Sequence, residues 1–365
     1  MPIGLDIGAR SIRMLQLDGG PRPPVVAACG QFEFPPDATE PAARRAITIE
    51  AIRQLLRAGS FVGRRVVTAL SPEAVSIKNV RLPRLPVAEL DQAVQIEASE
   101  RFGLDPSAGH FRFLRAGEVR SGDEVKQELI LFGVADAALR EHLGLLDELK
   151  LVPDAIEVGP CAVFRCFGRL LQRDSDKDVV TVCVDVGRPA SRVLIARGSQ
   201  IAFIKSIDIA GERFTRAVAE RLELSIDEAE PLRRRLGPVD ADAGADLAVQ
   251  PVRDQVRRAV ADAVREPIEQ LAKEIQLCLR YYSVTFRGPQ PERVIFVGGE
   301  ASEPTLVGRM SEALGLPCEV GEPLRGIDTS AARMGSDRRG LLADWATAAG
   351  LALRPMETAA LQEVA

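Results

Sequence analysis

Two copies of one short pattern, one in each half of the chain, constrain the fold more than any other feature of this sequence. The first copy is Gly4–Gly8, which contains Asp6, and a run of alternating apolar residues follows after Ala9–Ser11. The second copy is Val182–Gly187, which contains Asp185, and a similar run follows. Each copy predicts a strand, a tight Asp-x-Gly turn and a second strand. A chain with the same hairpin in both halves is predicted to fold as two related lobes.

Length and composition agree with a soluble protein of more than one domain. The 365 residues exceed the ~250–300 residues at which a single hydrophobic core stops growing. Apolar residues make up 46% and charged residues 27%, as in ordinary globular proteins. Because 52 acidic residues outnumber 47 basic ones, the sequence does not predict a nucleic-acid-binding surface.

Cysteine spacing and hydropathy give two further expectations. The six cysteines and two histidines lack the spacing of a zinc site, so buried and reduced cysteines are expected. No run approaches the ~18 apolar residues that span a bilayer, and Met1–Asp6 lacks the regions of a signal peptide. We therefore expect a cytoplasmic protein.

The segment between the hairpins predicts an inserted α+β subdomain at 75–154. Its predicted strands are Val75–Leu82, His110–Leu114 and Val125–Val134, and its predicted helices are Val87–Phe102 and Asp136–Leu149. The predicted domains are a first lobe of 1–74 with 155–178, the insert, a second lobe of 179–355 and a tail of 356–365. The second lobe includes a helical part at about 212–285, with one long helix from Pro251 to Tyr282 that Pro267 should kink.

Both Asp-x-Gly turns have a composition that suits phosphate. Glycine lets the backbone approach a phosphate closely, and successive N–H groups form an anion-binding nest. The hydroxyls of Ser11 and Ser191 can add hydrogen-bond donors. Asp6 and Asp185 repel phosphate, but they can hold the waters of a Mg²⁺ ion that bridges to it. One such turn is common in ordinary hairpins, whereas two at equivalent places are a more specific signal for a nucleotide.

A glycine pair near the end of the chain is the third element of this pattern. A predicted strand, Arg293–Val297, runs into Gly298-Gly299, and a predicted helix, Thr305–Leu314, follows. Bare backbone at a helix N-terminus would accept adenosine and its α-phosphate.

The order of these three elements resembles the phosphate 1, phosphate 2 and adenosine motifs of the actin, Hsp70 and sugar-kinase superfamily. Within it, the sequence resembles the type IV pilus assembly PilM family over about residues 2–354. Four stretches carry this closer resemblance: Val67–Ser71, Arg81–Pro86, Ala210–Thr215 and Ala348–Arg354. The resemblance implies an α/β, actin-like fold of two ribonuclease H-like lobes, with the inserted subdomain placed as in the related cell-division protein FtsA.

The resemblance also implies that ATP with Mg²⁺ lies between the lobes and that its turnover is slow or incidental. Matching the motifs assigns the phosphates to Asp6, Gly8, Ala9, Ser11, Asp185, Gly187 and Ser191, with Asp6 and Asp185 holding Mg²⁺ through water. It assigns the adenosine to Gly211, Glu212, Glu230, Arg233, Gly298, Gly299 and Glu300. Glu157 is the catalytic candidate, because it falls where the family often has an aspartate that can orient the attacking water.

These residues leave alternatives open. Glu157 fits an exposed acid at a strand end equally well, and Glu230 and Arg233 fit surface ion pairs. Two positions depart from the family pattern. Glu300 stands where the family usually has a third glycine, and Pro189 removes one N–H donor from the second turn.

The partner implied by the resemblance is a PilN-like inner-membrane protein, whose N-terminal cytoplasmic segment would dock in a groove beside the insert. We place that groove at Val80, Leu82, Leu85 and Leu90. Further partners would be pilus motor or platform proteins and a second copy of the chain, and the membrane would be reached only through partners. The chain would thus act as a scaffold at the inner face of the inner membrane, in a pilus or a related secretion machine.

Two other functions remain as alternatives. An FtsA-like filament-forming division protein needs a basic amphipathic helix at its C-terminus, and after Trp345 the only basic residue is Arg354. A small-molecule kinase of the same superfamily needs a general base and a polar substrate pocket, and only Glu157 suggests itself.

Overall fold

The two hairpins each begin a five-stranded sheet, and the two sheets have the same strand order. The computed structural model describes residues 1–19, 23–35, 38, 40–121, 124–171, 173–236, 250–332, 334 and 341–363. The first sheet has the order β3-β2-β1-β4-β8, with β1 (Ile3–Ile7), β2 (Ser11–Leu17), β3 (Val26–Glu33), β4 (Arg65–Ala69) and β8 (Val152–Glu157). The second has the order β11-β10-β9-β12-β13, with β9 (Val180–Val186), β10 (Ser191–Arg197), β11 (Gln200–Ile207), β12 (Val294–Val297) and β13 (Cys318–Val320).

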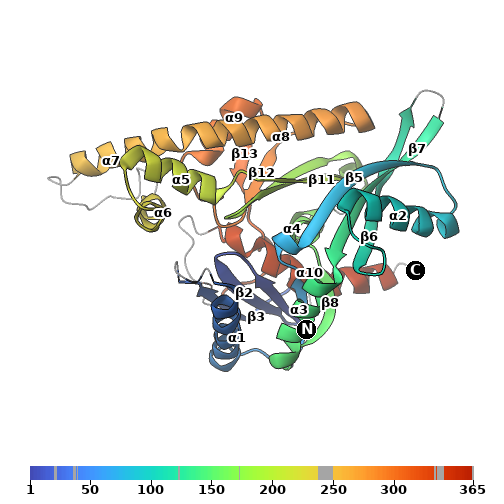
Figure 1. The fold of residues 1–365 in the computed structure, drawn as a ribbon, viewed down its shortest axis with the longest axis horizontal. Helices are drawn as coiled ribbons and strands as arrows, with labels where there is room; N and C mark the ends of the chain where they lie inside the picture. Colours follow the sequence, from blue (N-terminus) through green and yellow to red (C-terminus); the bar gives the residue numbers. More distant parts are fainter. Residues whose placement is uncertain are drawn as a thin grey trace.

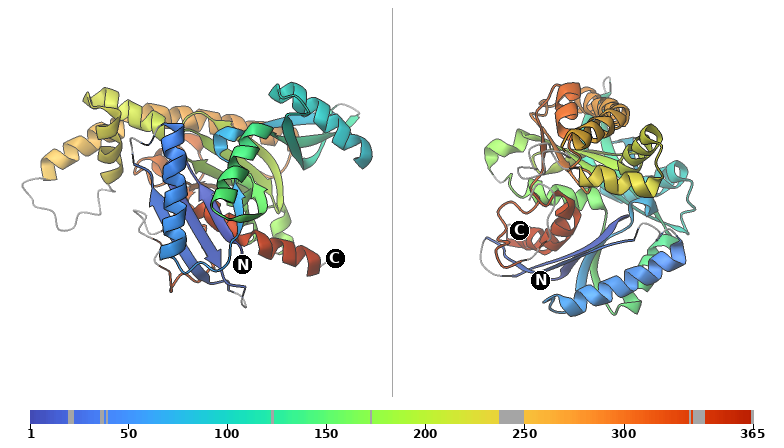
Figure 2. Two further views of the ribbon diagram at one scale, coloured as in Figure 1. Left: turned by 60° about the horizontal axis from the view of Figure 1, so that its bottom comes forward. Right: turned by 90° about the vertical axis from the view of Figure 1, so that its left-hand side faces the viewer.

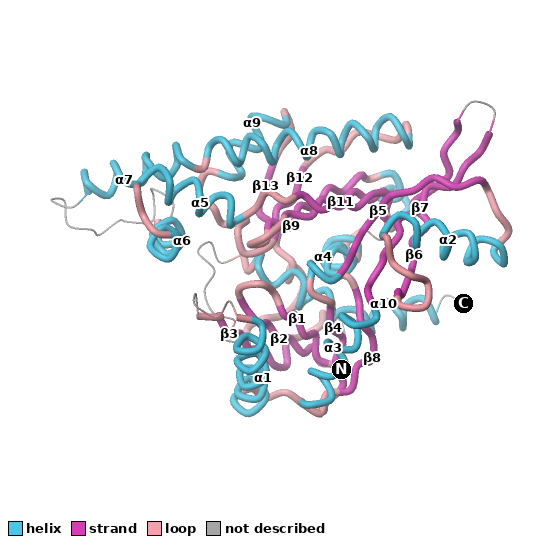
Figure 3. The backbone as a smooth tube through the Cα atoms, viewed as in Figure 1, coloured by secondary structure: helices cyan, strands magenta, loops and turns pink. Residues whose placement is uncertain are grey.

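Strand directions repeat as well. In each sheet the hairpin strands pair antiparallel, and the first hairpin strand also pairs parallel with the next strand, β4 or β12. The duplication predicted from the two Asp-x-Gly copies is therefore a duplication of the whole sheet. Figures 1 and 3 show the first lobe at the bottom of the view and the second lobe above it.

Two helices between the sheets join the lobes. They are α4 (Gly159–Gly168) and α10 (Ala346–Glu363), and their apolar residues share one core with β2, β9 and β12. Small residues allow the close approach, because a Cβ at Gly350 would lie 1.8 Å from the Ala162 carbonyl oxygen and one at Gly4 2.4 Å from that of Ala348. Helix α1 (Pro41–Ala58) covers the other face of the first sheet (Figure 2).

The insert has its own sheet and core. The sheet order is β5-β7-β6, with β5 (Val75–Pro83), β6 (Gly109–Ser121) and β7 (Glu124–Ala135), and α2 (Val87–Phe102) packs on it. The predicted helix Val87–Phe102 is confirmed, whereas β6 is much longer than the predicted His110–Leu114. The last helix, α3 (Asp136–Glu148), packs Leu146 into the first lobe, and β8 returns to that lobe's sheet at Val152. The predicted domain boundaries stay a proposal.

The second lobe carries α5 (Gly211–Leu222), α6 (Ile226–Arg235), α7 (Gln250–Ala263), α8 (Arg265–Phe286) and α9 (Leu306–Leu314). The long helix predicted from Pro251 to Tyr282 is interrupted at Val264 rather than bent at Pro267. The reason is local, because proline has no N–H for the carbonyl four residues earlier, at Ala263.

The predicted tail 356–365 is helical as far as the structure describes it. Helix α10 continues through Pro355 to Glu363, because Met, Glu, Ala, Leu and Gln in this segment all favour helix. Within the described residues, none of the helices combines the length and the apolar character needed to cross a bilayer.

Candidate functional site

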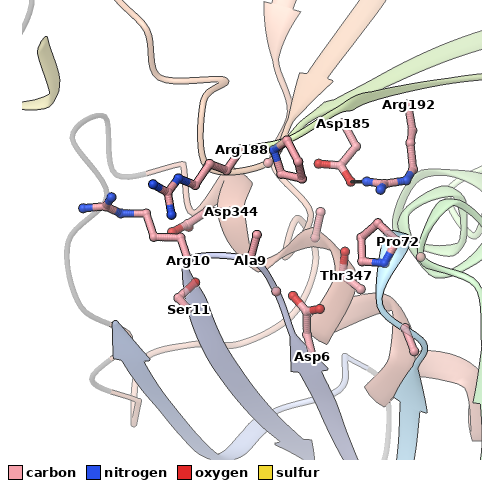
Figure 4. Close-up of a pocket in the computed structure, with 18 of the residues that line it drawn as sticks. Asp6, Ala9, Arg10, Ser11, Pro72, Asp185, Arg188, Arg192, Asp344 and Thr347 are labelled. Carbon is pink, nitrogen blue, oxygen red and sulfur yellow. Dashed lines mark ion pairs between the residues drawn. The ribbon is translucent and has the colours of Figure 1, made fainter. Parts of the chain in front are cut away.

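A cleft lies between the two lobes, where the turns of the two hairpins face each other. Its space, including the open mouth, is about 1170 Å³. Both hairpins line it, together with the loop at Gly298, the segment before α10 and the start of the insert at Val75 (Figure 4). Of the residues predicted from the sequence, nine line the cleft: Asp6, Gly8, Ala9, Ser11, Asp185, Gly187, Gly298, Gly299 and Glu300.

The first hairpin closes through its glycine. The Gly8 N–H donates to the Ser11 carbonyl over 2.9 Å, which turns the loop toward the cleft. In the register of β1 and β2, Asp6 lies directly opposite Arg13. The Arg13 guanidinium donates to the Ser11 hydroxyl at 2.6 Å and also to Asp344, in the segment before α10. In this half of the cleft the positive charge of Arg13 thus lies among the negative charges of Asp6 and Asp344.

The second hairpin repeats this arrangement with one exception. The Gly187 N–H donates to the Ala190 carbonyl over 3.2 Å, and Asp185 lies opposite Arg192. The Asp185 carboxylate and the Arg192 guanidinium form an ion pair at 3.8 Å (Figure 4). Ser191 differs from Ser11, because it is fully buried and its hydroxyl donates to the Ile209 carbonyl at 2.6 Å. The predicted phosphate contact of Ser191 therefore has no path to the cleft in this conformation.

Burial shifts the pKa of both cleft aspartates upward. It raises the pKa of Asp6 to about 6, although the nearby charge of Arg13 opposes the rise. It also raises the pKa of Asp185, and the charge of Arg192 again acts in the opposite direction. Both carboxyl groups are therefore easier to protonate than ordinary aspartates.

Glu300 is buried beside the loop at Gly298, with 4% of its surface exposed. Its carboxylate pairs with Arg233 at 2.7 Å and with Arg234 at 3.2 Å. Burial alone would raise its pKa, but the charges of these two arginines outweigh burial, so the pKa lies below its ordinary value. The negative charge that Glu300 introduces in place of glycine is thus matched by the protein itself. A Cβ at Gly211 would lie 2.7 Å from the Glu300 side chain, so this position must be glycine.

The loop at Gly298 differs from the expected helix N-terminus. Gly298 has a φ of +91°, which favours glycine, and its N–H donates to the Ala343 carbonyl at 3.0 Å. Two successive turns follow, and α9 begins only at Leu306. The N-terminal N–H groups of α9 therefore do not adjoin Gly298-Gly299.

The mouth of the cleft is crossed by a chain of ion pairs. Arg10, in the first hairpin, pairs with Glu230 on α6 of the second lobe. Arg188, in the second hairpin, lies 3.5 Å from the other Glu230 oxygen and 3.8 Å from Glu212. Glu230 and Glu212, both predicted to contact the adenosine, lie outside the cleft lining and instead hold the two hairpin arginines.

The family model for the type IV pilus assembly protein PilM matches residues 4–356. This chain belongs to the PilM family. Among curated proteins none has a matching sequence.

Two solved structures share the fold. The PilM-PilN type IV pilus biogenesis complex contains a chain that is 24% identical, with 97% of this chain and 98% of that chain covered and a TM-score of 0.78. The ethanolamine utilization protein EutJ from Carboxydothermus hydrogenoformans is 14% identical, with 96% and 89% covered and a TM-score of 0.55. The predicted actin-like fold of two lobes is confirmed.

Glu157, the predicted catalytic residue, lies outside the cleft lining of this PilM family member. It is 8% exposed at the end of β8, so it is not the exposed acid that was the alternative. Both carboxylate oxygens accept hydrogen bonds at 2.9 Å from Arg165 on α4, and Arg354 on α10 also pairs with it. The carboxylate is thus held by two arginines where α4 and α10 meet, and its position gives no support to a role in orienting water.

Arg233 is a core residue rather than a ligand of the cleft. It is 1% exposed and pairs with Glu303 at 2.7 Å as well as with Glu300, and the two carboxylates raise its pKa although burial opposes the rise. Arg233 is therefore not a contact of the adenosine but part of a buried ionic cluster that fixes Glu300.

The predicted groove residues divide into two groups. Val80 and Leu90 are buried in the core of the insert at 4% and 0% exposure. Leu82 and Leu85 are half-buried against the same core, near the end of β5 and the start of α2. Only the second pair can offer apolar surface to a partner.

The donor set does not fit the Mg²⁺ ion that the family resemblance implies. The described residues contain no group of three or more His, Cys, Asp or Glu side chains placed to hold a metal. Asp185 is paired with Arg192, and Asp6 lies opposite Arg13. A divalent cation between these aspartates would face two guanidinium groups, which repel it.

Sequence reasoning did not identify Arg10, Arg13, Arg192 and Asp344 as cleft residues. One signal was available, since arginine follows the aspartate by the same seven positions in both hairpins, at Arg13 and at Arg192. Nothing in the sequence marks Asp344, which reaches the cleft only because α10 begins there.

Proposed function

We propose that this chain is a nucleotide-binding scaffold of a type IV pilus assembly platform, and that it holds the N-terminal cytoplasmic segment of a PilN-like inner-membrane protein. The observation that carries the proposal is the PilM family match over residues 4–356, nearly the whole chain. Under this proposal the protein acts in the cytoplasm, at the inner face of the inner membrane, and reaches the membrane through its partner.

The partner is supported by the fold. The solved complex of PilM with PilN covers 97% of this chain, insert included, with a TM-score of 0.78. The insert adds half-buried apolar residues, Leu82 and Leu85, where its sheet meets α2. A short segment can bind such a surface through apolar anchors while its backbone pairs with a strand edge.

ATP is the nucleotide that we propose for the cleft. The two hairpin turns present Gly8 and Gly187 from opposite lobes, and Gly298-Gly299 supplies bare backbone between them. Such turns accept phosphate. The buried, paired Glu300 leaves no unmatched negative charge beside the base end of the cleft. Bound ATP would stabilise the folded protein by mass action, about 2.7 kcal/mol at 100 times its Kd.

A peptide titration tests the scaffold function. The labelled N-terminal peptide of a PilN-like protein from the same genome is titrated with the protein, and fluorescence anisotropy is recorded with and without ATP. We expect saturable binding near micromolar Kd, which corresponds to about −8 kcal/mol. Leu82→Asp and Leu85→Asp should weaken it, and Val62→Asp, an apolar residue exposed on the first lobe, is the matched control.

Each outcome bears on a separate part of the proposal. Binding that is weaker in both insert variants and normal in the control supports the scaffold and its groove. Binding that all three variants share places the peptide elsewhere on the molecule. No binding at all would overturn the pilus assignment.

A further inference from the structure

Each of the two phosphate-facing hairpins carries two arginines, an inner one and an outer one. The inner pair is Arg13 and Arg192, which lie opposite the hairpin aspartates in the strand register. The outer pair is Arg10 and Arg188, which stand in the turns and line the mouth of the cleft (Figure 4). Only the inner pair occupies equivalent positions, seven residues after the aspartate in each hairpin, whereas Arg10 follows its aspartate by four residues and Arg188 follows its aspartate by three.

The inner arginines place positive charge beside the carboxylates that would hold a metal. Arg192 pairs with Asp185 at 3.8 Å, and Arg13, which lies opposite Asp6 in the strand register, pairs with Asp344. A cation added here would have to displace a guanidinium that is 10% or 12% exposed and held by neighbouring groups. Magnesium keeps its own water shell and binds weakly to carboxylates that are already paired.

The outer arginines are the groups that remain for an anion. Arg10 and Arg188 are 28% and 27% exposed, and they converge from opposite lobes on the single carboxylate of Glu230. Several arginines gather there: burial and nearby Arg234 lower the pKa of Arg10, and burial and nearby Arg188 lower that of Arg44. The two guanidinium groups share Glu230, and each has one further carboxylate at 3.8 Å, Glu33 for Arg10 and Glu212 for Arg188.

Guanidinium is the side-chain group best matched to phosphate. Its planar N–H groups bind two phosphate oxygens at once, and it keeps its charge at any physiological pH. Two arginines that face each other across the cleft can bind one polyphosphate chain from both lobes. They would then balance the phosphate charge that a metal ion balances elsewhere.

We propose that Arg10 and Arg188 bind the polyphosphate of the nucleotide, and that this cleft takes ATP without a divalent cation. The inference rests on the nucleotide binding put forward under Proposed function. On binding, the two arginines exchange Glu230 for phosphate, so the ligand replaces the ion pair that joins Arg10 to the second lobe. The nucleotide thus takes the place of the Glu230 side chain at these two arginines.

Calorimetric titration of ATP into the full-length protein tests this. One titration is made in EDTA and one in millimolar MgCl₂, and inorganic pyrophosphate is used as a competitor. The two ATP dissociation constants should agree within about threefold, a difference of less than 1 kcal/mol. Pyrophosphate should compete, because the proposed contacts are made by the phosphates.

Four variants sharpen the test. Arg10→Gln and Arg188→Gln should each weaken ATP binding by about 10- to 100-fold, the size expected for a charge-assisted hydrogen bond to phosphate. Arg280→Gln, an exposed arginine of α8 outside the cleft, is the matched control. Glu230→Gln removes the competing carboxylate and should tighten ATP binding by about tenfold. Circular dichroism and thermal melting show whether each variant is folded.

The outcomes are distinct. Binding that requires Mg²⁺ and survives both arginine substitutions would overturn the inference while leaving nucleotide binding intact. Weaker binding in Glu230→Gln would also overturn it, because Glu230 would then hold the nucleoside as the family resemblance implies. Absence of ATP binding in both buffers would overturn the nucleotide part of the proposed function itself, whatever the peptide titration gives.

Discussion

In two regions of this molecule an acidic side chain is withdrawn from water beside an arginine. The two carboxyl groups differ in their hydrogen-bond partners and in the effect of burial on their pKa. Where the insert meets the second lobe, Glu128 on β7 is 1% exposed, and both of its oxygens have partners: Arg81 at 2.9 Å and the hydroxyl of Tyr281 on α8. In the cleft, Asp6 is half-buried, and its pKa is raised to about 6 because desolvation outweighs the charge of Arg13.

The Glu128 carboxylate thus contributes to the stability of the fold, whereas the Asp6 carboxylate lowers it. A buried carboxylate whose oxygens all have donors is costly to remove, because its partners would be left buried and unpaired. A buried carboxylate with a raised pKa costs stability, and proteins keep such groups mainly at sites of binding or chemistry. The raised pKa therefore indicates a binding site in the cleft, whereas the contact between the insert and the second lobe serves the stability of the fold.

The largest expected effect is at the insert. Glu128→Ala should lower the free energy of unfolding by about 3 kcal/mol, because it leaves Arg81 and the Tyr281 hydroxyl without their shared acceptor. Urea unfolding at neutral pH measures the change. Glu124→Ala, an exposed acid on the same strand, is the control and should change stability by about 0.5 kcal/mol or less. Equal losses in the two variants would remove the contrast.

Removing the charge of Asp6 in the cleft should instead increase stability. Asp6→Asn should raise the free energy of unfolding near neutral pH by about 2 kcal/mol, because it removes a partly desolvated charge whose pKa is raised to about 6. The folded pKa of about 6 exceeds the ordinary 3.8, so the wild type loses stability as pH rises from about 4 to about 6. The variant should lack this loss.

Unfolding measured across that pH range, for both proteins, checks the prediction. The same substitution at the exposed Asp174 is a control that should leave the pH dependence as it is in the wild type. If Asp6→Asn is less stable than the wild type at neutral pH, the carboxylate of Asp6 stabilises the fold, and the comparison fails.

A smaller loss is expected from Tyr281→Phe. The ring should keep its contact with Phe203, whose centroid lies 5.0 Å away, while the hydrogen bond to Glu128 is lost. Stability should fall by about 1.5 kcal/mol, the usual size for a bond to a charged group. A double-mutant cycle with Glu128→Ala measures the coupling, which should account for most of that loss. Additive effects would mean that the hydroxyl acts elsewhere.

The smallest change in stability is expected from breaking an exposed ion pair. Arg197 and Asp178 form an ion pair in which the side chains are 47% and 70% exposed. Arg197→Gln should change stability by about 0.5 kcal/mol or less, because water screens the pair and ordering the side chains offsets its attraction. A loss as large as that of Glu128→Ala would show that burial does not decide which pairs matter here.

Much of the fold could be read from local patterns. The repeated Asp-x-Gly hairpins predicted two related lobes, since a tight turn between alternating strands is a property of neighbouring residues. Helix Val87–Phe102 was predicted to the residue for the same reason. The interruption at Val264 was placed three residues too late, because the effect of Pro267 falls on the carbonyl four residues before it.

The site was only partly readable. Nine of the predicted residues line the cleft, because they stand in the turns and the glycine loop that the pattern identifies. Ser191 was misplaced, since the hairpin pattern does not tell which way its hydroxyl points. Val80 and Leu90 were assigned to a groove although they are core residues, because an apolar residue at a sheet face looks the same in sequence whether a partner or the protein's own helix covers it.

The sequence by itself determined the duplicated hairpins, the insert between them and membership of the PilM family, since all three follow from the order of residues along the chain. Only the tertiary structure decided the charge pattern of the cleft. Asp344 joins Arg13 across 331 residues and Glu230 joins Arg10 across 220, and Glu230 also pairs with Arg188 within the second lobe. Ion pairs depend on distance and burial, and both are properties of the folded chain rather than of sequence spacing.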